Sequence, residues 1–350
     1  MTFALIGNQN CGKTTLFNQL TGSNQHVGNF PGVTVDKKEG TIKNSGGAVV
    51  VDLPGIYSIS PYTMEEIVTR DYLLGGEPDG IINIVDATNI ERNLYLTLQL
   101  LELEMLMVVA LNMMDEVAGS GGSIDIQKIS AGLGVPVVPI SASKNEGVAE
   151  LVTVALRTVQ NNERPKHHDF CKGEVHRAIH SLAHMIEDHA EEKKIPLRFA
   201  ATKLVEGDEA MMDKLEINQN EREIVQHVAD EMEAALGTDR EAALADMRYS
   251  YIEQICAGAV HKPGDTAEQL RSVQIDRILT HKVFAIPIFL GIMLLVFWLT
   301  FGVVGSTLSD LFAAGISLVT NLADEALTRL DVAPMLHALI IDGIFAGVGS

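Results

Sequence analysis

A short glycine-containing segment near the start of the chain has the residue types of a phosphate-binding loop. Eight consecutive residues fit the pattern G-x-x-x-x-G-K-[ST], namely Gly7, Asn8, Gln9, Asn10, Cys11, Gly12, Lys13 and Thr14. In this pattern backbone N–H groups surround the phosphates at the start of a helix. We expect Lys13 to reach the β- and γ-phosphates and the Thr14 hydroxyl to bind Mg²⁺, with Thr15 completing the nucleotide-binding set.

A second segment supplies the groups that are needed beside such a loop. Asp52-Leu53-Pro54-Gly55 follows the apolar run 49–51. We expect the Asp52 carboxylate to lie beside the metal, together with Thr14, because a carboxylate at this position holds Mg²⁺ in P-loop enzymes. Gly55 has no side chain, so its backbone is free to approach the γ-phosphate.

Two later segments select the base. Asn112-Met113-Met114-Asp115 follows the apolar run 107–111, and Ser141-Ala142-Ser143 follows the run 137–140. The Asp115 carboxylate can accept hydrogen bonds from both N1–H and the exocyclic amine of guanine, whereas adenine offers no such pair of donors. We expect backbone amides near Ala142 to contact the guanine oxygen. The predicted ligand is therefore GTP or GDP.

A GTPase also needs a threonine that closes over Mg²⁺ and the γ-phosphate. The glycine-rich segment 28–34 includes Gly32, Val33 and Thr34, and Thr34 is the candidate. Segments of this kind become ordered around the γ-phosphate and relax after hydrolysis, which produces a switch. Thr41 is a weaker alternative because it falls inside a predicted hairpin.

The predicted catalytic set is Asn10, Lys13, Thr34 and Gly55, and it contains no glutamine. Some GTPases orient the attacking water with a glutamine after this glycine, but this chain has Ile56 there. The amide oxygen of Asn10 could instead bind K⁺, which would bridge the phosphates as an arginine does in other enzymes. The hypothesis is a slow, potassium-stimulated GTPase. The alternative is that Asn10 only shapes the loop.

Composition excludes some classes of protein. The 350 residues include 26 Lys and Arg against 46 Asp and Glu, for a net charge of −20, which argues against nucleic acid as a partner. Three widely spaced cysteines without a Cys-x-x-Cys pair exclude a disulfide scaffold and a zinc ribbon. The chain opens without a signal peptide, so its start is expected in the cytoplasm.

The motifs must be positioned by alternating strands and helices. Residues 1–160 show this alternation, which predicts an α/β domain with a mostly parallel sheet. A turn at 44–47 between alternating stretches predicts a hairpin and hence one antiparallel edge strand. Residues 165–275 are rich in helix formers, with breakers such as Pro196, Gly207 and Gly237. They predict a small all-helical domain.

The last part of the chain, residues 276–350, is predicted to enter a membrane. Residues 283–305 contain no charged residue, and 15 of these 23 are Val, Ile, Leu or Phe, which favours insertion by about 6 kcal/mol. Arg277 and Lys282 precede the span, so residues 1–275 are expected in the cytoplasm. Residues 306–335 are amphipathic and could form an interfacial or re-entrant helix. Asp342 lies in an apolar segment, where an ionisable group suggests a pathway residue.

Together these segments resemble the ferrous iron transport protein B (FeoB) family. The resemblance rests on the phosphate loop with Thr15-Leu16-Phe17-Asn18 after it, on segments 27–35, 52–58 and 112–115, and on Asp276-Arg277-Ile278-Leu279-Thr280-His281 before the span. It implies a cytoplasmic G domain, a helical spacer resembling a GDP-dissociation inhibitor, and a polytopic inner-membrane domain that carries Fe²⁺. Segment 342–349, within the region 334–350, resembles the start of a glycine-rich gate. The chain stops at Ser350, where the family has further spans, so it looks like an N-terminal fragment.

The resemblance also implies partners and localisation. It implies a bacterial inner (plasma) membrane protein, multi-pass when complete, with membrane lipid around it and small cytoplasmic Feo accessory proteins as partners. A homo-oligomer is left open. Two other functions are also open: a membrane-tethered regulatory or assembly GTPase that transports no ion, and an RNA-modifying or ribosome-assembly GTPase, against which the span and the acidic charge weigh.

Two further features have both a functional and a structural interpretation. His176, His180 and His184 would form one stripe on a helix, near His167 and His168, and could hold a transition metal or simply face solvent. Cys11 could have a lowered pKa at the helix N-terminus and be open to oxidation, or could only fill the loop.

Overall fold

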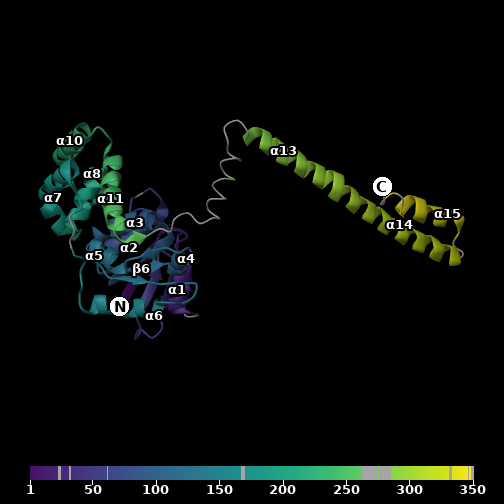
Figure 1. Ribbon diagram of the computed structural model, residues 1–350, viewed down its shortest axis with the longest axis horizontal. Helices are drawn as coiled ribbons and strands as arrows, with labels where there is room; N and C mark the ends of the chain where they lie inside the picture. Colours follow the sequence, from purple (N-terminus) through teal and green to yellow (C-terminus); the bar gives the residue numbers. More distant parts are fainter. Residues whose placement is uncertain are drawn as a thin grey trace. The chain divides into compact units, whose positions relative to one another are not determined.

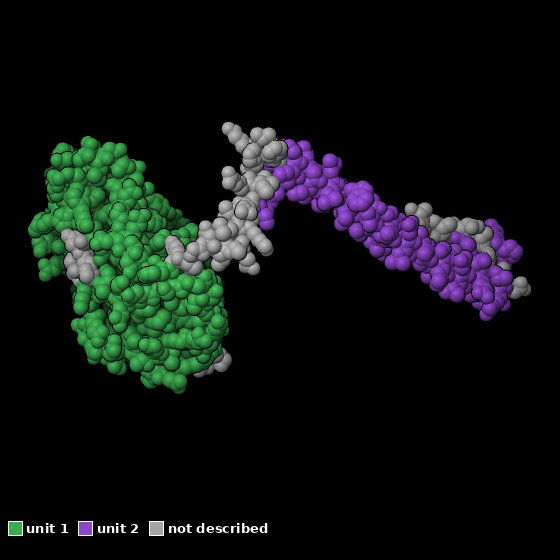
Figure 2. Space-filling view, viewed as in Figure 1, with its two compact units in different colours: residues 1–263 green, residues 264–350 purple. Residues whose placement is uncertain are grey.

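A computed structural model describes residues 1–22, 25–30, 33–60, 62–166, 170–261, 275, 279, 285–330, 333–345 and 347. Contacts between residues divide the chain into two units, 1–263 and 264–350, which are coloured separately in Figure 2. The first unit contains the predicted α/β region and the predicted helical region up to residue 263. The second contains the predicted span.

A seven-stranded sheet forms the centre of the α/β region, in the order β2-β3-β4-β1-β5-β6-β8. Five of its strands are β1 Thr2–Gly7, β4 Val49–Asp52, β5 Gly80–Asp86, β6 Met107–Asn112 and β8 Val137–Pro139, and three of them lie at the apolar runs predicted at 49–51, 107–111 and 137–140. These five strands are mutually parallel. The predicted fold class is therefore confirmed.

The predicted hairpin is present, and one more strand lies outside it. β3 (Asp36–Thr41) runs antiparallel to β4, as expected. β2 (Gln25–Asn29), which the hydrophobic pattern did not predict, pairs with β3 and forms the edge of the sheet. Its side chains are mostly exposed, so it has no alternation of buried and exposed residues from which to recognise it.

Helices cover both faces of the sheet. Successive side chains of β1 point to opposite faces, and both sets are buried. Phe3 and Leu5 pack with α1 (Lys13–Thr21) and α6 (Val148–Gln160) on one face. Ala4 and Ile6 face a second cluster of buried residues on the other side. From the α/β region, α2 (Met64–Leu74), α3 (Ile90–Leu101) and α5 (Ile126–Leu133) contribute to this second cluster. Because the same cluster continues into the helical region, the two regions share one core.

The helical region contains five helices among the described residues. They are α7 (Gly173–Lys193), α8 (Leu197–Glu206), α9 (Glu209–Lys214), α10 (Gln219–Leu236) and α11 (Arg240–Ala257). Figure 1 shows α7, α8, α10 and α11 gathered beside the sheet region. The predicted helix breakers lie at helix boundaries. Pro196 precedes α8, while Gly207 and Gly237 follow the last residues of α8 and α10 and have left-handed φ of 80° and 70°.

The remaining elements of the first unit are short. They are the 3-10 turn η1 (Ala87–Asn89), α4 (Met114–Gly119), β7 (Ser123–Ile124) and β9 (Val260–His261). β7 and β9 pair antiparallel, so the chain after α11 returns to the α/β region.

Two buried groups of charges join the α/β region to the helical region. Arg70 of α2 donates to Asp208 at 2.9 Å. Arg248 of α11, whose side chain is 1% exposed, lies 2.9 Å from Glu206 and 3.5 Å from Glu102 at the end of α3. These charged residues are far apart in the sequence and have no motif. Sequence analysis therefore missed them.

Glu102 makes folding stability dependent on pH. Burial raises the pKa of its carboxyl above the ordinary 4.5, although the nearby charges of Arg248, Lys203 and Arg198 oppose this effect and Glu206 adds to it. A carboxyl with a higher pKa in the folded state binds more protons when folded, so its contribution to stability falls as pH rises from 4.5. We expect Glu102→Gln to reduce the loss of unfolding free energy between pH 5 and pH 7, as measured by urea unfolding.

The exposed neighbour Glu104 provides the control for this prediction. Glu104→Gln changes the same charge at the same end of α3, and it should keep the pH dependence of the wild type. An unchanged pH dependence in Glu102→Gln would contradict the assignment.

The second unit begins with a long helix. Ala285–Arg329 is continuous and comprises α13 (Ala285–Phe297), the π-helical η2 (Trp298–Val304) and α14 (Gly305–Arg329). An 18-residue stretch of it has a mean hydropathy of 2.5, and the helix is long and apolar enough to cross a membrane. The predicted span lies within it from Ala285 onward, but the helix does not end near Gly305. Residues 306–329 continue it, since no proline interrupts them.

Two short elements follow this helix, α15 (Pro334–Ala338) and the π-helical η3 (Leu339–Phe345). They cover part of the gate-like segment. Residues 276–278 and 280–284, just before the long helix, lie outside the described part of the chain.

Candidate nucleotide site

The four predicted nucleotide motifs all lie at one edge of the sheet. Gly7 ends β1, Asp52 ends β4 and Asn112 ends β6, while Ser141 follows β8. Because these strands are parallel, their carboxyl ends meet at the same edge, where open α/β sheets bind ligands. Segments separated by up to about 130 residues of sequence are thus brought together.

The backbone of the phosphate loop depends on its small residues. Gly12 has a left-handed φ of 90°, and a Cβ built there would lie 2.3 Å from the side-chain nitrogen of Asn112. Gly7 is equally confined, since a Cβ there would lie 2.5 Å from the carbonyl oxygen of Ile84. Asn10 is also left-handed, with φ of 64°. The exposed Asn10 side chain has no hydrogen bond to any described residue, so it is accessible to a ligand.

A cavity of about 580 Å³ adjoins this loop. Among the residues that line it are Lys13, Thr14, Thr34, Asp52 and Pro54. The Lys13 ammonium contacts the Asp52 carboxylate, and both side chains are largely buried. Thr14, Thr34 and Asp52 supply hydroxyl and carboxylate oxygens, which are the ligands that Mg²⁺ prefers. The donor set therefore fits the predicted metal.

The segment with Thr34 is held at its start. Phe30 is buried and packs edge-on against Tyr72 of α2, with ring centroids 5.8 Å apart. The Phe30 N–H donates to the carbonyl of Val35 at 2.9 Å, while Thr34 itself is exposed. Gly32 lies outside the described residues. Thr41 is at the far end of β3, opposite Val49, and does not line the cavity.

Asn112 connects two of the motifs. It is 3% exposed, its side-chain nitrogen donates to the carbonyl of Cys11 at 2.9 Å, and its oxygen accepts from the N–H of Ala142 at 2.9 Å. In addition, Gln19 of α1 donates to the carbonyl of Ala142 at 3.3 Å. Asn112 therefore holds the phosphate loop and the segment 141–143 in register.

Asp115, the predicted base-reading residue, lies in the first turn of α4, shortly after the end of β6. A hydrogen bond from Ser141 is the main cause that lowers the pKa of this carboxyl, and Lys144, whose ammonium is 3.1 Å away, lowers it further. The carboxylate is thus kept ionised, as acceptance of two hydrogen bonds requires. Sequence analysis missed Lys144, although a lysine directly after Ser143 could have suggested it. Met113 precedes α4 with a left-handed φ of 64°.

Cys11 and Ile56 are both buried beside the loop. Burial raises the pKa of the Cys11 thiol to about 11, so the suggestion of a lowered pKa is wrong and Cys11 fills the loop as a neutral thiol. The Ile56 side chain is 2% exposed and belongs to the core. Gly55 lies against Gln9, where a Cβ would be 3.2 Å from the Gln9 side chain.

The histidine stripe shows no metal-site geometry. The rings of His180 and His184 stack at 4.6 Å between centroids, and His176 packs edge-on against His180 at 5.7 Å. Within the described ranges, no group of three or more His, Cys, Asp or Glu residues is placed to hold a metal. His167 and His168 are outside those ranges.

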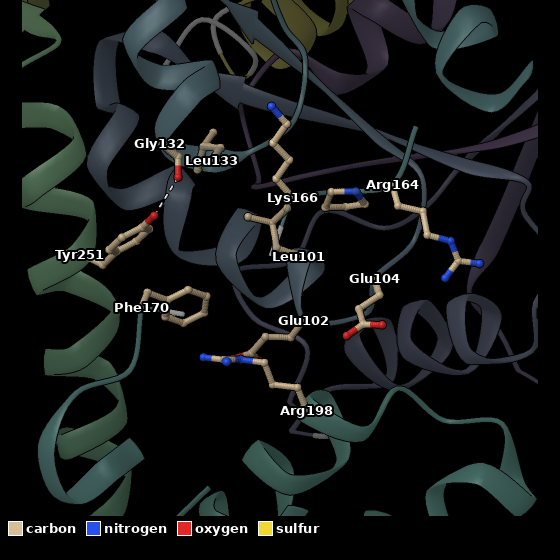
Figure 3. Close-up of a pocket in the computed structure, with 11 residues that line it drawn as sticks. Leu101, Glu102, Glu104, Gly132, Leu133, Arg164, Lys166, Phe170, Arg198 and Tyr251 are labelled. Carbon is tan, nitrogen blue, oxygen red and sulfur yellow. Dashed lines mark hydrogen bonds between the residues drawn. The ribbon is translucent and has the colours of Figure 1, made fainter. Parts of the chain in front are cut away.

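A second cavity, of about 270 Å³, lies where α3 and α5 meet the helical region (Figure 3). Leu101, Phe170, Arg198 and Tyr251 are among its lining residues, and Tyr251 donates to the carbonyl of Gly132 at 2.8 Å. No nucleotide motif contributes to it.

A parallel sheet with a phosphate loop, an aspartate beside a metal cavity and an Asn-x-x-Asp segment at one edge defines a P-loop GTPase domain. A GDP-bound mutant of NFeoB from S. thermophilus has a closely similar crystal structure, with 41% identity and a TM-score of 0.70, over 74% of this chain and 99% of that one. Residues 1–155 match the model for ferrous iron transport protein B, and residues 172–261 match the FeoB cytosolic helical domain. The chain belongs to the FeoB family.

Longer relatives extend the similarity beyond these domains. The Fe(2+) transporter FeoB of Staphylococcus aureus (strain MSSA476) is 37% identical over 351 residues, covering 99% of this chain and 52% of that protein. An Fe(2+) transport protein A/Fe(2+) transporter FeoB fusion protein of Porphyromonas gingivalis is 36% identical over 361 residues, covering 99% of this chain and 42% of that protein. The chain thus spans about half the length of these relatives or less.

Proposed function

We propose that this chain binds GTP and GDP with Mg²⁺ and hydrolyses GTP. The observation that carries the proposal is the cavity shared by Lys13, Thr14, Thr34 and Asp52 at the phosphate loop. Lys13 would hold the β- and γ-phosphates, while Thr14, Thr34 and Asp52 would hold the metal. The metal, when bound, would neutralise charge that develops on the phosphates.

The roles of the other nucleotide-binding residues are assigned from their positions in the fold. Gly7–Thr15 would surround the phosphates, Gly32, Val33 and Thr34 would close over them, and Asp52–Gly55 would approach from the opposite side. Asp115 would read the guanine edge, with Met113 beside the base, while Asn112 and Ser141–Ser143 position the base site. The geometry that supports these roles is the bridge from Asn112 to both Cys11 and Ala142.

We further propose that the GTPase cycle gates or drives Fe²⁺ uptake across the bacterial inner membrane. The family membership and the names of the longer relatives support this function. The domains would be a cytoplasmic G domain at 1–160, a helical spacer at 165–275, and the start of a multi-pass membrane domain at 276–350 in contact with lipid. The fusion relative supports small Feo accessory proteins as partners.

Vesicle uptake tests this function. The complete protein, reconstituted into lipid vesicles, should take up Fe²⁺ in a GTP-dependent manner and in preference to Mn²⁺ and Zn²⁺. Thr34→Ala should abolish GTP-stimulated uptake because Mg²⁺ and the γ-phosphate lose a ligand. GTP hydrolysis without any metal uptake would instead favour a membrane-tethered regulatory GTPase.

We also propose that hydrolysis is slow and stimulated by K⁺. The support is that Ile56, in place of a water-orienting glutamine, is buried, whereas the Asn10 amide is exposed at the loop. A cation held by Asn10 would stabilise the charge of the transition state, as an arginine does elsewhere.

Asn10→Ala should lose the potassium response. We expect wild-type turnover to be about tenfold or more higher in K⁺ than in Na⁺, and the variant to turn over GTP equally slowly in both. Asn18→Ala, which makes the same substitution at an exposed asparagine of α1 outside the phosphate loop, is the matched control and should keep the response. Equal turnover of the wild type in both salts would refute the proposal.

A further inference from the structure

A second lysine lines the cavity at the phosphate loop. Lys38 of β3 lines it together with Lys13, although no nucleotide motif includes Lys38. Lys38 is half-buried. Its ammonium has no hydrogen bond or ion pair with any described residue, whereas the Lys13 ammonium contacts Asp52. The cavity therefore contains one cation that is already paired and one that is available.

Strand pairing places Lys38 on the same face of the sheet as Asp52. β3 and β4 are antiparallel, and Lys38 is the direct partner of Asp52 in their register. Directly paired residues point to the same face with Cβ atoms about 5 Å apart. Because the lysine stem has four carbons, the Lys38 ammonium can extend past the Asp52 carboxylate into the cavity.

The neighbouring Lys37 points to the opposite face. Its ammonium lies 3.5 Å from a carboxylate oxygen of Glu39 and 5.7 Å from the ring centroid of Tyr72. Successive side chains of a strand alternate between faces, so Lys37 and Lys38 lie on opposite faces of the sheet. Lys37 therefore packs against α2, whereas Lys38 lines the cavity.

The charged residues that line the cavity indicate the role of Lys38. Three carboxylates line it, those of Asp36, Asp52 and Glu65, against the two ammonium groups of Lys13 and Lys38. Bound Mg²⁺ and Lys13 would contact the β-phosphate as well as the γ-phosphate, so they serve GDP and GTP alike. Lys38 follows Thr34 by four residues and lines the same cavity as this threonine, which is the residue expected to close over the γ-phosphate.

We propose that Lys38 binds the γ-phosphate and is the cation by which this site prefers GTP over GDP. The inference rests on the GTPase function proposed above. Lys38 would donate a charge-assisted hydrogen bond to a γ-phosphate oxygen, an interaction that GDP cannot make. Because Lys38 is part of β3, this contact would also couple the γ-phosphate to the strand that continues from the Thr34 segment.

Binding measurements on the full chain in detergent test the proposal. Affinities for GDP and for a non-hydrolysable GTP analogue are measured with saturating Mg²⁺, together with GTP turnover. We expect Lys38→Met, which keeps the stem and removes the charge, to lower affinity for the analogue by about 10- to 100-fold. Affinity for GDP should stay within about twofold, because the lost contact is specific to the γ-phosphate.

Two further variants complete the design. Lys37→Met removes a charge from the opposite face and should leave both affinities unchanged. Lys38→Arg restores a cation and should recover most of the affinity for the analogue. It also keeps the test informative if Lys38→Met folds poorly, since any folded Lys38→Arg must still prefer the analogue.

The outcomes separate this inference from the proposed function. An equal loss of affinity for GDP and the analogue in Lys38→Met would show that Lys38 only supports Asp52 or the fold, and would overturn the inference. Unchanged affinities would overturn it as well. Failure of the wild type to bind or hydrolyse GTP would instead refute the GTPase function itself.

Discussion

Asp115→Asn is expected to lower the affinity for GTP and GDP by about 100-fold and to create affinity for XTP. A carboxylate accepts from both N1–H and the exocyclic amine of guanine, whereas an asparagine amide has one acceptor and one donor edge. Loss of a charge-assisted pair of this kind corresponds to roughly 3 kcal/mol. Xanthine has a carbonyl in place of the amine, so the new donor of asparagine suits it.

The measurement is competition among GTP, XTP and ATP for a fluorescent guanine nucleotide. Glu116→Gln is the matched control, because it removes a neighbouring exposed carboxylate of α4 and should change nothing. Since Ser141 and Lys144 lower the pKa of Asp115, wild-type affinity should not fall as pH decreases from 8 to 5 through loss of this charge. Persistent GTP preference in Asp115→Asn would contradict the base-reading role.

Lys13→Ala is expected to reduce GTP turnover by about 100- to 1,000-fold. Electrostatic stabilisation of the phosphates is the largest part of phosphoryl-transfer catalysis, and Lys13 is the cation that the loop supplies for it. The substitution also leaves the largely buried Asp52 carboxylate without its ammonium partner. We therefore expect weaker nucleotide binding in addition to slower turnover.

Phosphate release under single- and multiple-turnover conditions measures this effect. Lys43→Ala is a suitable control, because the Lys43 ammonium donates at 3.2 Å to the exposed end of α1, away from the cavity. The melting temperature of Lys13→Ala shows whether the fold is kept. Turnover within about threefold of the wild type would be incompatible with the proposed site.

The order of the motifs along the chain was enough to predict the sheet edge at which they meet. Asp52 and Asn112 follow continuous apolar runs, which in an α/β protein form buried parallel strands. The carboxyl ends of such strands lie side by side whatever the loops between them contain. For this reason the location of the candidate nucleotide site could be predicted without any tertiary contact.

Other parts of the site could not be predicted, because they depend on the register of strand pairing and on contacts between segments that are distant in the sequence. The assignment of Lys38 to the face of Asp52 follows from the pairing of β3 with β4, and a shift of one residue would have exchanged it with Lys37. Asn112 was expected to help recognise the base. In the structure it also bridges Cys11 and Ala142, two residues that only the packed sheet brings together.

The sequence by itself determined the class of domain, the predicted nucleotide and the apolar helix, because each follows from local patterns of residue type. Only the tertiary structure decided how the helical region joins the α/β region. Arg248, Glu102 and Glu206 are ordinary surface residues by sequence, yet they form a buried cluster. Charges are buried only when partners from several elements converge on them, and such convergence of distant segments leaves no periodic signal in the chain.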